Sequence, residues 1–271
     1  MQETDHHHLP DENRLSIVIA VVLLAYAVSP YVKAPVQGFV VRVTGLVFPF
    51  QIEFSTVIGL LAATLAATGM YWIISSHPYV GGHHPLAHGI LPALTAWAIG
   101  VPLNTGIIKA QWWGVFALGG ALLVLVCLAE YIVVDFADSR HGPATVGLTA
   151  VSFALFLVLV IALRAAELRL YLLLPAILIT IFLMSLRTLY LRLEGRWSVE
   201  WAAVIAGVVA QIALALHYMP IAPLNFGLFL LGVAYALTSL AGAVLEGQPW
   251  RTLWIEPTII LAFSWLLAII M

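Results

Sequence analysis

Apolar stretches of about 20 residues with few charges dominate this chain, and that is the length an α-helix needs to cross a bilayer core roughly 30 Å thick. Only 9% of the 271 residues are Asp, Glu, Lys or Arg, against about 25% in a typical soluble domain. This composition excludes a soluble enzyme and predicts a protein whose main solvent is lipid. Nine candidate spans can be drawn, at residues 15–32, 55–75, 89–106, 110–135, 145–163, 170–191, 199–219, 224–244 and 253–271.

The pattern inside these stretches favours helices over the strands of a membrane barrel. Barrel strands alternate apolar and polar residues, whereas runs such as 17–24 and 153–161 are apolar throughout. We therefore predict an all-α fold, a polytopic transmembrane helical bundle of about nine spans. The count falls to eight if segment 89–106 is partial, because that segment is short and contains Pro92 and Pro102. Residues 1–14 are expected to form a polar N-terminal tail, and 15–271 a single membrane-embedded helical domain.

One connector differs from the rest. Segment 34–53 is rich in Val and Phe, and Thr44-Gly45 separates two β-like runs within it. Such a pattern predicts a short β-hairpin or flap at the membrane surface. An ordinary interfacial loop is the alternative.

Charge and cysteine content limit the partners. A net charge of −2 with 11 Lys and Arg residues argues against nucleic-acid binding, and the single Cys127 excludes an internal disulfide. The expected environment is the lipid bilayer of the cell membrane, and a protein partner or a homo-oligomer remains compatible with the sequence. Arg187, Arg192 and Arg196 cluster around one connector, which favours an inside location for the N-terminus.

Ionisable residues inside a span are functional candidates, because inserting a charge into lipid costs a few kcal/mol. Glu130 lies near the end of the fourth predicted span, and Arg187 lies within the sixth at a similar depth. The two are expected to form an ion pair, serving either ligand or ion binding or the structure. Arg164 and Arg169, which flank Glu167, are interpreted as interfacial anchors.

A polar stripe marks the seventh and eighth spans. Gln211 is near mid-membrane, one helical turn from Gly207, and Tyr235 and Ser239 lie along one face of the eighth span. Buried amides in lipid usually bond to a neighbouring helix. Packing of these two spans against each other is the first interpretation, and a ligand pocket lined by Gln211, Tyr235 and Ser239 is the second.

Four histidines, His77, His83, His84 and His88, fall in one connector rich in Gly and Pro. If a helix begins near Pro85, then His84 and His88 lie one turn apart, a spacing that suits a metal ligand pair. The connector lacks an acidic residue to orient an imidazole, and the chain has no HExxH motif. No cofactor is expected, and zinc or iron at these histidines is the alternative.

These observations predict an integral membrane protein that binds or transports a small molecule or lipid, or that acts as a membrane assembly subunit. No convincing catalytic motif is found in the sequence. The alternative is an intramembrane lipid-modifying enzyme that uses the histidine connector as its interfacial site.

Overall fold

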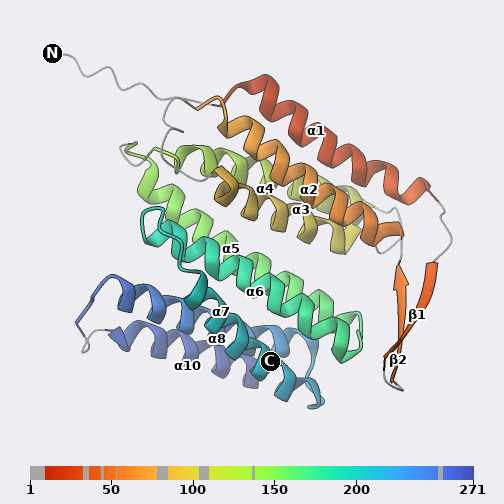
Figure 1. Cartoon of the computed structure of the whole chain (residues 1–271), viewed down its shortest axis with the longest axis vertical. Helices are drawn as coiled ribbons and strands as arrows, with labels where there is room; N and C mark the ends of the chain where they lie inside the picture. The colour runs from red at the N-terminus through yellow and green to blue at the C-terminus, as the bar shows by residue number, and fades with distance from the viewer. Residues whose placement is uncertain are drawn as a thin grey trace.

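The computed structural model (Figure 1) describes residues 10–32, 37–43, 46–52, 54–77, 85–103, 110–135, 138–249 and 253–271. Its α-helices are α1 (Glu12–Val28), α2 (Phe54–Ile74), α3 (Ile90–Leu103), α4 (Ala110–Ile132), α5 (His141–Ala165), α6 (Leu170–Arg192), α7 (Val199–His217), α8 (Pro223–Leu245) and α10 (Ile255–Ile270). The 3-10 helices η1 (Ser29–Tyr31) and η3 (Pro85–Gly89) follow α1 and precede α3, and strands β1 (Gln37–Val43) and β2 (Leu46–Ile52) lie between α1 and α2.

Eight of the described helical segments are long and apolar enough to cross a bilayer. This finding confirms the predicted bundle of eight to nine spans, and the chain is an integral membrane protein. Segment 89–106, which could have been a partial span, is long enough to cross the bilayer. Helices η3 and α3 together supply the 18-residue candidate span Leu86–Leu103. Pro92 lies in the first turn of α3, where its missing N–H breaks no helical hydrogen bond. The shorter apolar helix is instead the last, α10, with 16 residues.

The predicted hairpin at 34–53 is present. Strands β1 and β2 pair antiparallel, with Gln37 opposite Ile52 at one end and Val43 opposite Leu46 at the other. Thr44 and Gly45, the predicted turn, lie outside the described residues. Figure 1 shows the hairpin at the end of the bundle where α1 ends and α2 begins.

Buried apolar side chains divide the bundle into two halves with a shared interface. One cluster lies within α1–α4, the N-terminal half, and another lies within α5–α8, to which α10 packs through Leu261. A third cluster joins α3 and α4 to α5 and α6, with Leu91 and Leu159 among its members. The halves therefore meet along α3–α6, in the middle of the molecule as drawn in Figure 1.

Consecutive spanning helices alternate in direction, so their ends gather on two sides of the bundle (Figure 1). The N-terminal side, where α1 begins, also holds the start of α3 and the ends of α4 and α6. The opposite side holds the start of α2, the end of α3 and the turn between α5 and α6. This arrangement places the polar groups described below at the two ends of the interface between the halves.

Candidate functional site

Three charged or titratable side chains, His88, Glu130 and Arg187, meet in the core on the N-terminal side of the interface. Arg187 Nε donates to Glu130 Oε1 at 3.0 Å, and Arg187 Nη2 donates to Glu130 Oε2. His88 Nδ1 lies 2.9 Å from Glu130 Oε2. Glu130 and Arg187 are completely buried, and His88 is 3% exposed. The expected ion pair is therefore present, and His88 extends it to a triad.

Local packing fixes where His88 enters the core. Gly89, the next residue, brings the start of α3 close to α2. A Cβ at Gly89 would lie 3.1 Å from the carbonyl oxygen of Ala67 and 3.3 Å from its Cα. These are backbone atoms, which cannot rotate away as a side chain would, so the glycine allows this approach.

The charges of the Glu130 carboxylate and the Arg187 guanidinium balance each other, and most of the polar atoms of the triad have a hydrogen-bond partner. A carboxylate only accepts hydrogen bonds, so His88 donates to Glu130 when Nδ1 carries the proton. Arg187 Nη2 also lies 3.2 Å from His88 Nδ1, and it donates to that nitrogen in the other tautomer. The Arg187 guanidinium also lies over the ring of Tyr190, with 5.3 Å from Cζ to the ring centroid. Among the described residues, Arg187 Nη1 alone of this group has no hydrogen-bond partner. Two buried ions compensate their loss of hydration only when they are paired this closely. Because Glu130 lies on α4 and Arg187 on α6, their ion pair joins the two halves of the bundle.

The other predicted site residues do not join the triad. Helices α7 and α8 pack against each other, as first interpreted, but Gln211 is exposed on α7 and makes no hydrogen bond with a described residue of α8. The buried face of α7 is instead its row of small and branched side chains, including Ala206 and Val209. Tyr235 donates its hydroxyl hydrogen to Glu256 Oε1 at 2.6 Å, and the carbonyl oxygen of Ser239 accepts from Arg192 Nη1 at 3.1 Å.

The histidine connector is only partly described. His77 is buried with its ring 4.5 Å from that of Tyr131, and His88 belongs to the triad. His83 and His84 lie outside the described residues. Within the part of the chain that the structure describes, no group of three potential ligands could hold a metal ion.

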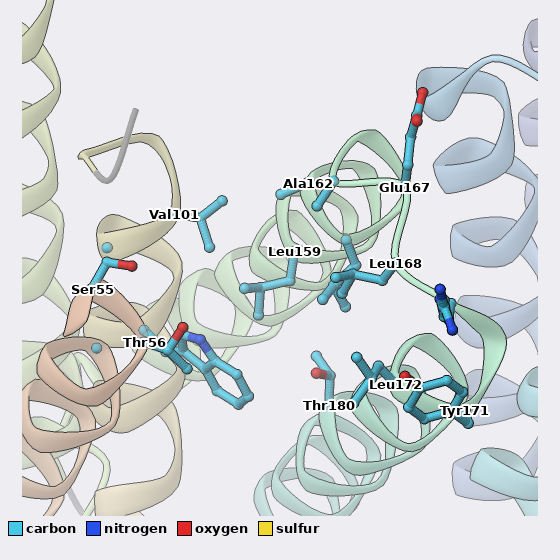
Figure 2. Close-up of a pocket in the computed structure, with 16 residues that line it drawn as sticks. Ser55, Thr56, Val101, Leu159, Ala162, Glu167, Leu168, Tyr171, Leu172 and Thr180 are labelled. Carbon is cyan, nitrogen blue, oxygen red and sulfur yellow. The ribbon is translucent and has the colours of Figure 1, made fainter. Parts of the chain in front are cut away.

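A cleft of about 590 Å³ opens at the other end of the interface, on the side opposite the N-terminal one. Figure 2 shows Ser55 and Thr56 of α2 facing Leu172 and Thr180 of α6 across it, with Leu159 of α5 between them. A volume of this size falls within the range of about 300–1,000 Å³ that is typical of small-molecule sites.

The cleft is lined by hydrocarbon along its helices and by charged side chains at the turn between α5 and α6. Val101, Leu159 and Ala162 belong to the helical walls, and Glu167 and Arg169 lie in the turn, at the rim. Thr180 is a polar residue of the wall, and its hydroxyl donates to the carbonyl oxygen of Ala176 at 2.7 Å. Both rim residues are exposed. They also border a second hollow of about 450 Å³, where Arg164 Nη1 lies 3.1 Å from His217 Nδ1.

Glu167 adopts the left-handed backbone conformation, with φ of 49°. It follows the last turn of α5, where its N–H donates to the carbonyl oxygen of Arg164 at 3.1 Å. Glycine is the usual residue at such a helix end, because a side chain there is strained. Glu194 takes the same conformation after α6, with φ of 51°, but only Glu167 of the two lines the cleft.

The sequence does not reveal this cleft, although it marks Arg169 at the rim as an interfacial anchor. Nothing in the spacing of Ser55, Trp97 and Arg169 indicates that three separate segments meet. The signal that could have helped is topological: the start of α2, the end of α3 and the turn between α5 and α6 all lie on one side of the membrane.

Glu246, just after α8, offers a test of the fold outside the spanning segments. Its carboxylate accepts from Arg192 Nη2 at 3.0 Å, and this hydrogen bonding lowers the pKa of Glu246 below its ordinary value of 4.5. A carboxylate whose pKa is lowered by folding stabilises the folded protein at pH values above its ordinary pKa of 4.5. This stabilisation is lost as the pH falls from 4.5 through the pKa of the folded state. We expect the melting temperature in detergent to fall more steeply in that range for the wild type than for Glu246→Gln. Parallel curves would contradict the assignment.

Comparison with known proteins adds one finding. A family profile described as "Protein of unknown function (DUF5656)" matches residues 34–271. No curated protein and no solved structure matches the chain. The matched region contains the hairpin, the triad and the whole lining of the cleft. This integral membrane protein thus belongs to the DUF5656 family.

Proposed function

We propose that the protein binds a phospholipid, or a molecule of the same amphipathic class, in the cleft between the two halves of the bundle. The observation that carries the proposal is the lining of the cleft, which combines hydrocarbon side chains along the helices with the charged Glu167 and Arg169 at the turn between α5 and α6. A phospholipid has the same division between acyl chains and headgroup.

The helical walls of the cleft suit an acyl chain. Val101, Leu159 and Ala162 present only hydrocarbon, and Leu172 continues this surface on α6. A chain bound here would contact side chains from both halves of the bundle. Binding would then depend on how closely α2 and α3 approach α5 and α6.

The rim suits a headgroup. The guanidinium of Arg169 can donate two parallel hydrogen bonds to a phosphate, a geometry that favours Arg over Lys. Glu167, two residues away, offers a carboxylate to an ammonium group of the same headgroup. Ser55, Thr56 and Tyr171 add hydroxyl groups to the lining near the helix ends.

The side of the membrane follows from the topology. The cleft opens on the side opposite the start of α1. With the N-terminus inside the cell, as the arginine cluster favours, the bound molecule would come from the outer leaflet. Transport would require a further route across the membrane and is not part of the proposal.

The triad is the other candidate for a ligand site, and its burial argues against it. Its side chains are buried and its charges pair with each other, so it offers a ligand no open surface. The hypothesis of an enzyme that uses the histidine connector has less support than that of a binding protein, because His88 is in contact with Glu130 in the core.

Blocking the cleft should test the proposal. We expect Ala162→Trp to weaken the binding of dioleoyl phosphatidylglycerol at least about tenfold, because the indole would occupy the space of the acyl chain. Native mass spectrometry of the purified protein, titrated with this lipid, measures the dissociation constant. Ala165→Trp is the matched control, since Ala165 lies three residues on, is exposed and does not line the cleft.

A second measurement separates the headgroup from the chains. Arg169→Gln should weaken the binding of phosphatidylglycerol about tenfold, because the charge-assisted hydrogen bonds to the phosphate are lost. The binding of dioleoylglycerol, which lacks the phosphate, should be unchanged. Equal binding of phosphatidylglycerol by the wild type and Ala162→Trp would overturn the proposal.

A further inference from the structure

Helix α7 carries a row of outward-facing residues that no described helix covers. They are spaced alternately four and three residues apart, the spacing of two helices that pack along their length. Val204 is 60% exposed and Leu214 is 37% exposed. The row comprises Glu200, Val204, Gly207, Gln211 and Leu214.

Gln211 is the unusual member of this row. It lies three residues beyond the midpoint of the 19-residue helix, or about 4.5 Å along its axis, and so deep in the bilayer. Its side chain is exposed and makes no hydrogen bond with another described residue. An amide without a partner in hydrocarbon is costly, because no water is present to replace the bond.

Other polar groups on the outer surface solve this problem within the protein. Thr64 and Thr68, both exposed on α2, donate to carbonyl oxygens of their own helix at 2.8 Å. Asn225 of α8 donates to the carbonyl oxygen of Ala268 at 2.8 Å. Gln211 makes no such bond with a described residue, so a group from outside this copy of the chain is needed to satisfy its amide in the bilayer.

The surface next to Gln211 leaves room for that group. Gly207 lies one turn before it, and a Cβ built at Gly207 would meet nothing within 4 Å. Small residues at such positions let two helices approach closely in a membrane. The open glycine and the unpaired amide are independent features of the same face.

We propose that two copies of this chain associate through α7, with Gly207 and Gln211 at the centre of the contact. Copies in one membrane share their orientation, so a two-fold axis along the membrane normal makes the two α7 helices parallel. Each residue of the row then faces its own counterpart.

A carboxamide is complementary to itself, because it carries both an N–H donor and a carbonyl acceptor. Two Gln211 side chains can therefore satisfy each other, which favours a second copy over an unrelated partner. Glu200 lies in the first turn of α7, where water at the membrane boundary screens its counterpart.

Cysteine cross-linking tests the geometry. Gly207→Cys, placed in a Cys127→Ala background and oxidised with copper phenanthroline in phosphatidylcholine vesicles, should give a disulfide-linked dimer. Leu125→Cys is the control, because Leu125 is 62% exposed on α4 but lies on another face. Absence of the Gly207→Cys dimer, or equal cross-linking of the control, would overturn the proposal.

An affinity measurement tests the role of the amide. Subunit counting by photobleaching, across a series of lipid dilutions, gives the dimer dissociation constant in vesicles. Gln211→Leu should raise this constant about tenfold through loss of the reciprocal hydrogen bonds. Thr64→Val, which removes a polar group already bonded within its helix, should leave it unchanged. A wild type that is monomeric at every dilution, or a Gln211→Leu variant that dimerises as well as the wild type, would contradict the inference.

Discussion

Arg187→Met is expected to lower the free energy of unfolding by about 3–5 kcal/mol, because it leaves the Glu130 carboxylate buried without its main partner. Glu130 has no exposed surface, so water cannot replace the two hydrogen bonds from the guanidinium. Unfolding of the purified protein in mixed micelles, followed by helical circular dichroism against the SDS fraction, measures the change.

The same helix supplies the control. Arg192 also pairs with a glutamate, Glu246, but both side chains are 29% exposed. Arg192→Met should therefore cost about 1 kcal/mol or less, as exposed ion pairs do. The double variant Glu130→Gln with Arg187→Met should cost less than the sum of the two single changes, because it leaves no unpaired ion. Equal losses for Arg187→Met and Arg192→Met would refute the structural role of the triad.

Gly232→Ala is expected to destabilise the protein by about 1–3 kcal/mol, since it adds an atom to a contact that has no room. Gly232 lies on α8 against α10, and a Cβ there would overlap Ser264 Oγ and lie 3.0 Å from Ser264 Cβ. Either the Ser264 hydroxyl rotates away and loses its hydrogen bond to the carbonyl oxygen of Leu261, or α10 moves away from α8. The same SDS titration measures the loss.

Two further variants make this result specific. Gly147 lies in α5 with nothing within 4 Å of a built Cβ, so Gly147→Ala should be neutral or stabilise by up to about 1 kcal/mol through helix propensity. Adding Ser264→Gly to Gly232→Ala should restore part of the stability, because it vacates the space the methyl group needs. If the double variant is no more stable than Gly232→Ala alone, the overlap is not the cause.

Much of the architecture follows from the sequence, because lipid imposes a simple rule on length and polarity. The apolar stretches predict the helices, and the similar depths of Glu130 and Arg187 predict their pairing. For His88 the sequence offers a metal ligand only as the alternative, because its position one turn from His84 is visible in the sequence and its distance from Glu130 is not. Only the packing of α3 against α4 reveals that contact.

The sequence does not predict which face of α7 is buried in the bundle. In a soluble protein a polar row on a helix faces water, and in a membrane protein it is expected to face other helices. Gln211 follows neither rule within one copy of the chain, because the small side chains of α7 occupy its buried face. Which face is buried depends on how α6 and α8 approach, and one helix does not encode that.

The triad and the cleft lie at opposite ends of the same interface, and this placement constrains how the halves can move. Because separating the halves at the triad would leave its buried ions unpaired, we expect the mouth of the cleft to widen by rotation about the triad. From Arg187 to Leu170, at the cleft end of α6, the lever is about 25 Å long. A rotation of about 10° would therefore move that end by about 4 Å, enough to change which headgroups can enter.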